Sequence, residues 1–234
     1  MIPITKKLIR YNFSSRLGEK IQYIVIHDTG NSRAGADAEA HFNYFNGGDR
    51  GASAHYFVDD SRIIQVVEDE KASWHCGDGR GKYGITNQNS LGVEICINAD
   101  GDYNRALANT LDLTSYLMKK YSVRPEKVVR HFDASGKICP GTMKADNWAR
   151  WREFKQDLLK ALDPELERAI GLFVKKKLMD SPAYWREHAR PGQTVNGEYA
   201  GFLLKRTAAY IALREQMAAR GAIGAGRPAT KKDC

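Results

Sequence analysis

Short β-type runs alternate with helical patterns over the first 162 residues, and this alternation restricts the fold more than any other feature. Five runs rich in β-branched and aromatic residues predict strands. They are YIVIH (23–27), SAHYFVDD (53–60), RIIQVVE (62–68), LGVEICIN (91–98) and VVRHF (128–132). Apolar residues at three- and four-residue spacing predict helices over 36–46, 104–121 and 145–162. We therefore expect an α/β domain with a mixed central β-sheet flanked by helices.

After residue 162 only helical periodicity and loop patterns remain. Pro164 suits the first turn of a helix that extends to about Leu178, and a longer helix is expected from about Glu198 to Ala219. The segment ARPGQTVNGEY between them predicts a loop. The expected domains are the α/β domain at 1–162, a small all-α C-terminal domain at 163–222, and a disordered tail at 223–234.

The basic excess lies in the C-terminal part of the chain. Residues 1–163 hold 23 Lys and Arg against 21 Asp and Glu, whereas residues 164–234 hold 13 against 7. An anionic partner is indicated there, such as a wall polymer, nucleic acid or a membrane surface, although a solvated basic face gives the same count.

No targeting or membrane-spanning pattern is visible in the sequence. The first twenty residues contain no apolar run of signal-peptide length, and no stretch of about 18 apolar residues follows. We therefore expect synthesis in the cytoplasm, no membrane insertion, and export by another route. The four cysteines lack paired spacing, so no disulfide framework is expected.

Polar residues near the ends of predicted strands form a candidate site. His27 and His131 close two strands, Glu94 lies near the end of a third, and Cys139 follows a short loop. Two imidazoles and a thiolate are a plausible ligand set for zinc, with the fourth position open for water. Glu94 could shuttle protons, and Lys137 could stabilise an oxyanion.

Spacing alone leaves other interpretations open. A lone His or Cys is often an ordinary core or surface residue. A Cys–His nucleophile pair would need a thiolate, an oxyanion hole and usually a third orienting residue. That pair would leave His27 without a role.

Five blocks in order give a more specific signal: YIVIHDTGN, SAHYFVDD, ASWHCGDG, NSLGVEICIN and VVRHFDASGKICPG. Together they resemble the zinc-dependent N-acetylmuramoyl-L-alanine amidases of the type-2 amidase and peptidoglycan-recognition-protein superfamily. The resemblance covers roughly residues 18–162 and is strongest to phage and prophage endolysins of Bacillus-like Gram-positive hosts. It implies the type-2 amidase fold and hydrolysis of the amide between the lactyl group of N-acetylmuramic acid and L-alanine in peptidoglycan.

The resemblance also implies roles for the residues of the candidate site. His27, His131 and Cys139 match the three ligands of one zinc ion per chain. Glu94 matches the acidic residue near the metal-activated water, and Lys137 matches the catalytic lysine two positions before the cysteine.

Three further residues are expected to contact substrate. His55 occupies the position where several relatives carry a catalytic tyrosine, so both substrate binding and proton transfer are open for it. Trp74 and His75 match a loop that lines the substrate groove. Cys76 and Cys96 match no ligand position and are predicted to be structural thiols.

The resemblance bears on activity and partners as well. Cys139 favours an active wall enzyme, because inactive receptors of this superfamily typically lack the cysteine and cytosolic recycling amidases carry a carboxylate there. The alternative is a non-catalytic peptidoglycan-binding protein, or a regulator that uses the basic C-terminal helices. No nucleic-acid motif is present, so no nucleic-acid partner is expected.

For residues 163–222, the resemblance to endolysins implies a module that holds the enzyme on anionic polymers of the Gram-positive wall. A helical hairpin that packs on the catalytic domain or dimerises is the alternative. The resemblance further implies passage from the host cytoplasm to the wall through a holin pore at lysis.

Overall fold

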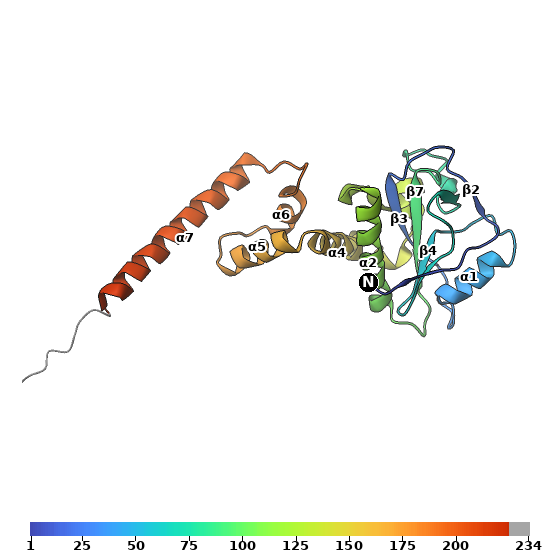
Figure 1. The fold of residues 1–234 in the computed structure, drawn as a ribbon, viewed down its shortest axis with the longest axis horizontal. Helices are drawn as coiled ribbons and strands as arrows, with labels where there is room; N and C mark the ends of the chain where they lie inside the picture. The colour runs from blue at the N-terminus through green and yellow to red at the C-terminus, as the bar shows by residue number, and fades with distance from the viewer. Residues whose placement is uncertain (225–234) are drawn as a thin grey trace, which may run out of the picture. The chain divides into compact units, whose positions relative to one another are not determined.

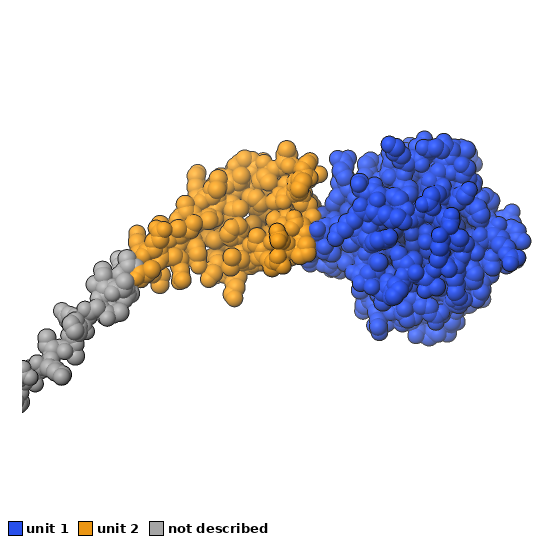
Figure 2. All heavy atoms as spheres, viewed as in Figure 1, with its two compact units in different colours: residues 1–162 blue, residues 163–234 orange. Residues whose placement is uncertain are grey.

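The computed structural model of the protein describes the backbone of residues 1–224 and the side chains of residues 1–218. Contacts divide the chain into two compact units, Met1–Leu162 and Asp163–Cys234 (Figure 2). The predicted disordered tail, residues 223–234, lies outside the described residues except for its first two positions. Each unit has a hydrophobic core of its own.

A six-stranded sheet forms the centre of the first unit, in the order β1-β5-β4-β7-β3-β8 (Figure 1). Its strands are β1 (Ile4–Lys6), β3 (Tyr23–Asp28), β4 (Tyr56–Val58), β5 (Ile63–Gln65), β7 (Ser90–Ile95) and β8 (Val128–Arg130). The β4–β5 pair is antiparallel, and the other neighbouring pairs of this sheet are parallel. The predicted mixed sheet is therefore confirmed. β2 (Phe13–Ser15) and β6 (Lys71–Ser73) form a separate antiparallel pair.

Helices cover both faces of the sheet, because its central strands are largely apolar on both sides. The helices α2 (Tyr103–Tyr121) and α4 (Ala145–Leu162) pack on one face, and α1 (Ala38–Asn46) packs on the other (Figure 1). The core on the α2 side includes Ile24, Ile26, Leu91, Val93, Leu113 and Phe154. Strand alternation turns His27 and Glu94 to the opposite face, where they are direct partners across the β3–β7 pair.

The chain leaves the sheet two residues earlier than predicted at the fifth predicted strand, VVRHF (128–132). β8 ends at Arg130, and His131 is the first residue of the short helix α3 (His131–Ser135). The Asp133 carboxylate accepts hydrogen bonds from the Arg130 backbone N–H at 2.8 Å and from the Arg130 guanidinium at 2.6 Å. These bonds cap the helix, so His131 starts a helix where the sequence predicted a strand end.

The second unit contains the helices α5 (Pro164–Lys175), α6 (Pro182–His188) and α7 (Gly197–Gly224). Buried Ile170, Met179 and Trp185 form its core, and Leu203 of α7 packs against them. The sequence pattern did not predict α6, because seven residues are about two turns and too few to show a period. The side chains of residues 211–218 in α7 are all exposed.

Among the helices that the structure describes, none has both the length and the hydropathy required to cross a bilayer.

Candidate metal centre

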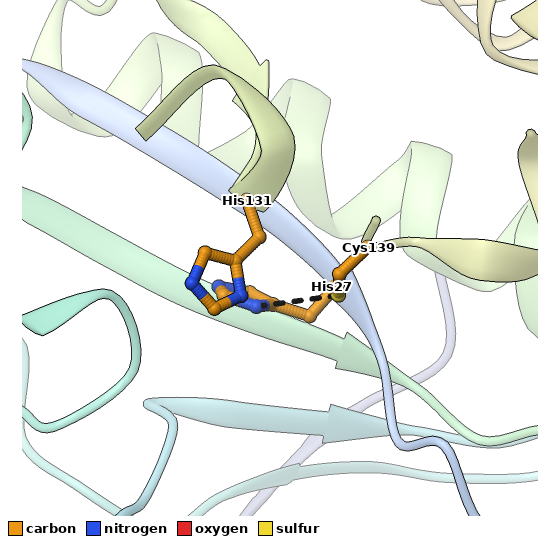
Figure 3. A group of neighbouring side chains, drawn as sticks. All are labelled: His27, His131 and Cys139. Atoms are coloured by element: carbon orange, nitrogen blue, oxygen red, sulfur yellow. Dashed lines mark hydrogen bonds between the residues drawn. The ribbon is translucent and has the colours of Figure 1, made fainter. Parts of the chain in front are cut away.

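Three predicted metal ligands converge at one edge of the sheet. His27 is a buried residue of β3, and its Nδ1 lies 3.7 Å from the Cys139 Sγ (Figure 3). One potential ligand atom from each of His27, His131 and Cys139 lies within 4.8 Å of the others, and all three residues are buried. The arrangement can hold a metal ion.

His131 and Cys139 come from the segment that follows β8. The backbone N–H of Phe132 donates to the Cys139 carbonyl at 3.1 Å, which brings the loop back beside the start of α3. The His131 Nε2 lies 2.8 Å from the Asp78 Oδ1, whereas its Nδ1 is buried and has no hydrogen-bond partner. Buried polar atoms are normally satisfied, so this nitrogen is the one suited to a metal.

The electrostatic setting keeps the three ligands uncharged in the absence of a cation. Burial, together with the nearby His131 and Lys137, holds the pKa of His27 well below its usual value. Burial also lowers the pKa of His131, although Asp78 opposes the effect. Burial, assisted by Glu94, raises the pKa of the Cys139 thiol to about 12. Because metals bind the thiolate, metal uptake should release a proton from this cysteine.

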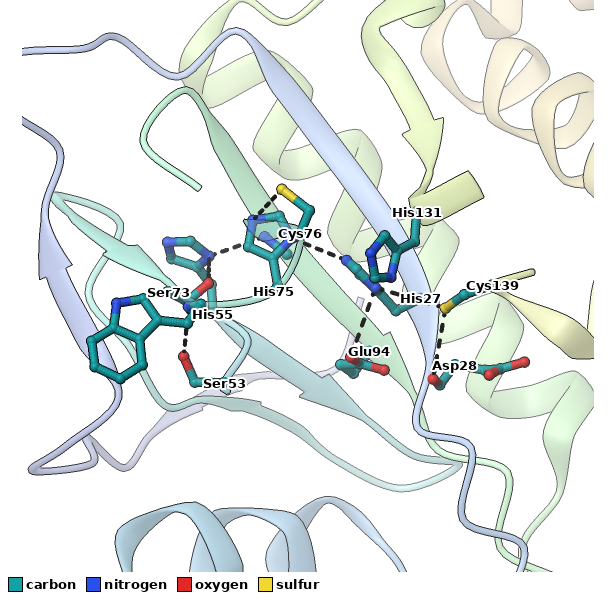
Figure 4. Close-up of polar contacts among 12 residues, drawn as sticks. His27, Asp28, Ser53, His55, Ser73, His75, Cys76, Glu94, His131 and Cys139 are labelled. Carbon is teal, nitrogen blue, oxygen red and sulfur yellow. Dashed lines mark hydrogen bonds and ion pairs between the residues drawn. The ribbon is translucent and has the colours of Figure 1, made fainter. Parts of the chain in front are cut away.

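Glu94 faces the same site from the neighbouring strand. Its Oε1 lies 3.9 Å from the His27 Nδ1, its side chain is 18% exposed, and its Oε2 is buried without a hydrogen-bond partner (Figure 4). Burial raises the pKa of Glu94 well above its usual range, Asp28 adds to this, and the Lys137 ammonium opposes it. The charge of exposed Lys137 therefore acts on Glu94.

Two of the three predicted substrate contacts lie inside the domain. His55 is fully buried, and its ring contacts the Ser73 Oγ, the Gly92 N–H and the Lys71 carbonyl. His75 is only 8% exposed and lies behind His27, with its Nδ1 3.0 Å from the His27 Nε2 (Figure 4). Burial leaves neither ring accessible for the predicted substrate contact. Trp74 is partly exposed, and its indole N–H donates to the Ser14 Oγ at 3.3 Å.

Asp78 is a site residue that sequence reasoning missed. Its carboxylate accepts hydrogen bonds from His131 and, at 3.2 Å, from the Ser135 hydroxyl. These bonds outweigh the effect of burial and lower the pKa of Asp78. The loop can approach α3 because Gly79 follows, where a Cβ would lie 2.2 Å from the Ala134 carbonyl oxygen. The block ASWHCGDG contains this aspartate, but no sequence pattern indicates its partner.

Comparisons with known proteins agree with this geometry. The Amidase_2 family model, described as N-acetylmuramoyl-L-alanine amidase, matches residues 17–142, which is more than half of the chain. Two curated relatives from Bacillus subtilis, the N-acetylmuramoyl-L-alanine amidases CwlH and XlyA, are 38% and 39% identical over 150 residues. These alignments cover 63% of this chain but 59% of CwlH and 49% of XlyA, so the chain spans half to three fifths of their length.

Solved structures resemble the first unit. The catalytic domain of XlyA matches with a TM-score of 0.59 and 37% identity, over 66% of this chain and 97% of that one. The structure of PlyL matches with a TM-score of 0.57 and 35% identity, over 67% of this chain and 97% of that one.

The burial of His55 predicts an acid-sensitive fold. Burial, with the nearby Arg16 cation, lowers the pKa of His55 to about 3, whereas an unfolded histidine titrates near 6.5. Between these values the unfolded chain binds a proton that the folded chain does not, so stability falls as pH drops below about 6.5. At pH ~4.5 this histidine alone should cost about 2–3 kcal/mol relative to pH ~7.

Urea unfolding of the metal-free protein and of His55→Asn at both pH values measures this cost. The other buried histidines contribute to both proteins, so the difference between the two pH dependences isolates His55. The variant should lose about 2–3 kcal/mol less stability on acidification. Equal losses would contradict the assignment.

Proposed function

The chain belongs to the N-acetylmuramoyl-L-alanine amidase family, and from this premise we propose that it hydrolyses the amide between the lactyl group of N-acetylmuramic acid and L-alanine in peptidoglycan. The observation that carries the proposal is the convergence of His27, His131 and Cys139 within the family-matched part of the chain. A similar solved structure, a mutant endolysin from Bacillus subtilis that is 39% identical over 66% of this chain, supports a lytic enzyme of phage or prophage origin.

We propose zinc as the metal, one ion per chain. Zinc–nitrogen bonds of about 2.0–2.1 Å and zinc–sulfur bonds of about 2.3 Å place tetrahedral ligand atoms roughly 3.5 Å apart. The 3.7 Å between the His27 Nδ1 and the Cys139 Sγ fits this value, and the unpartnered His131 Nδ1 supplies the third donor. When bound, zinc supplies Lewis acidity, which polarises a carbonyl and lowers the pKa of a nucleophilic water to about 7.

The side chains around the ligands supply proton transfer and charge stabilisation. The Glu94 carboxylate takes a proton from the attacking water and returns it to the leaving amine of L-alanine. Its Oε2, which has no hydrogen-bond partner in the protein, is the atom free to do so. The Lys137 ammonium stabilises the negative charge that develops on the carbonyl oxygen. Trp74, with part of its side chain exposed, is our remaining candidate for contact with the sugar or the peptide.

We further propose that the second unit holds the enzyme on anionic polymers of the Gram-positive wall. Support comes from the basic excess of 13 Lys and Arg against 7 Asp and Glu in residues 164–234. In this account the enzyme is made in the host cytoplasm and reaches the wall after holin-type release.

Replacing Cys139 by Ala tests the ligand set. Loss of a residue that only hydrogen-bonds a metal ligand weakens metal binding by up to ~100-fold. Because Cys139→Ala removes a ligand itself, its zinc affinity should fall by more than this. Metal analysis after dialysis, together with chelator competition, measures this loss. Cys96→Ala, which removes a buried thiol outside the site, is the matched control and should retain zinc. Full zinc binding by Cys139→Ala would refute the site.

Replacing Glu94 by Gln tests the reaction. The variant should retain zinc while kcat falls by about 10²–10⁴-fold, because the proton acceptor is lost and the shape is kept. The assay is digestion of purified Gram-positive peptidoglycan, with separate detection of new L-alanine amino termini and new reducing sugars. Reducing sugars from the native protein would identify a glycosidase. A native protein with neither zinc nor cleavage would contradict the amidase and favour the alternative, a non-catalytic binding protein.

Truncation after Leu162 tests the role proposed for the second unit. The remaining unit has its own core and should hydrolyse a soluble peptidoglycan fragment with unchanged kcat/KM, but sediment less with intact walls. In the full chain, Lys175→Gln with Lys176→Gln should weaken wall binding and reduce its salt dependence. Lys20→Gln with Lys119→Gln, two exposed lysines of the first unit, is the control. A truncated chain that binds walls as tightly as the full chain would exclude this role.

A further inference from the structure

A chain of buried hydrogen bonds continues behind His27, away from the side that faces Cys139 and Glu94. The His27 Nε2 lies 3.0 Å from the His75 Nδ1 (Figure 4). The His75 Nε2 lies 3.0 Å from the Ser90 Oγ. The Ser90 Oγ in turn contacts the Thr86 carbonyl oxygen. His27, His75 and Ser90 are all buried, so the protein itself must satisfy these groups.

The far end of this chain determines the direction of every bond in it. A carbonyl oxygen only accepts, so the Ser90 hydroxyl donates its proton to Thr86. The Ser90 oxygen then accepts from the His75 Nε2–H, which leaves the His75 Nδ1 without a proton. This nitrogen accepts from the His27 Nε2–H. Because the His27 proton is on Nε2, the His27 Nδ1 is unprotonated, and its lone pair is available beside Cys139.

The position of the His75 ring is itself fixed by its surroundings. The Asn87 Oδ1 accepts hydrogen bonds from the backbone N–H groups of His75 and Cys76, at 3.1 and 2.9 Å. Gly92 of β7 gives the ring its space, because a Cβ there would lie 2.6 Å from the His75 Cγ. The ring thus packs directly on the strand that carries Glu94.

We propose that His75 is a positioning residue for the metal centre: its Nδ1 holds His27 in the tautomer and orientation that present the His27 Nδ1 to the metal. The inference rests on the metal site of the proposed function and adds a residue to it. Because both rings are buried, no water replaces the acceptor when His75 is lost, and the His27 Nε2–H is then left without a partner.

Two substitutions separate this hydrogen bond from simple packing. His75→Asn places an amide oxygen near the position of the Nδ1 and can still accept from His27. His75→Leu fills a similar volume without an acceptor. The zinc dissociation constant of the full chain, measured by chelator competition, should rise by about 10–100-fold in His75→Leu, and His75→Asn should restore most of the affinity.

A spectroscopic measurement reports the tautomer directly. In the zinc-loaded native protein, ¹⁵N NMR of the imidazoles should show His27 protonated at Nε2, with a slowly exchanging proton. This signal should persist in His75→Asn and be lost or broadened in His75→Leu. Far-ultraviolet circular dichroism and urea unfolding of the metal-free proteins verify that the variants are folded.

Native zinc affinity in His75→Leu would overturn the proposal. Equal losses in His75→Leu and His75→Asn would also overturn it, because packing and not the hydrogen bond would then be responsible. Zinc affinity is measured without substrate, so the test of His75 remains valid even if the protein does not hydrolyse peptidoglycan. A native chain that binds no zinc would remove both the proposed metal site and the role of His75.

Discussion

The parallel pairing of β3 and β7 is the constraint on which the site depends. Their register sets His27 opposite Glu94 on one face of the sheet, while the alternate residues of both strands fill the core beneath α2. A one-residue shift of either strand would turn its polar residue into that core and place an apolar side chain at the site. The apolar alternation that stabilises the sheet therefore also determines that the candidate ligand His27 faces the Glu94 carboxylate.

Burial at this edge of the sheet disfavours negative charge on the side chains there, and a bound cation would offset this effect. Burial makes the charged forms of Cys139 and Glu94 unfavourable, and two atoms, the His131 Nδ1 and the Glu94 Oε2, have no hydrogen-bond partner in the protein. A divalent cation would favour the thiolate and the carboxylate and would use the free nitrogen. The His27 Nε2–H donates to His75 and the His131 Nε2–H donates to Asp78, which leaves the Nδ1 atoms of both histidines for a metal.

Local periodicity predicted the central sheet and the helices that flank it, whereas the choice of His27, His131 and Cys139 as ligands depended on the resemblance of five ordered sequence blocks. Local periodicity did not predict the strands β1, β2 and β6, because these, unlike the equally short β4, β5 and β8, do not lie in longer runs of β-branched and aromatic residues. The sequence also could not predict that His55 and His75 are buried or that Asp78 bonds to His131. Each depends on which loop packs against which strand, and positions such as Gly92, which admits the His75 ring, are informative only once that packing is known.

Hydrogen bonds also join the segments that carry the three candidate ligands. Asp28, which follows His27, accepts hydrogen bonds from the Thr142 backbone N–H at 2.9 Å and the Thr142 hydroxyl at 3.0 Å, three residues after Cys139. Phe132, which follows His131, donates to the carbonyl of Cys139 itself. Each histidine segment is therefore tied to the cysteine segment through its next residue. Ligands held in this way lose little conformational freedom when a metal binds, so more of the coordination free energy remains as affinity.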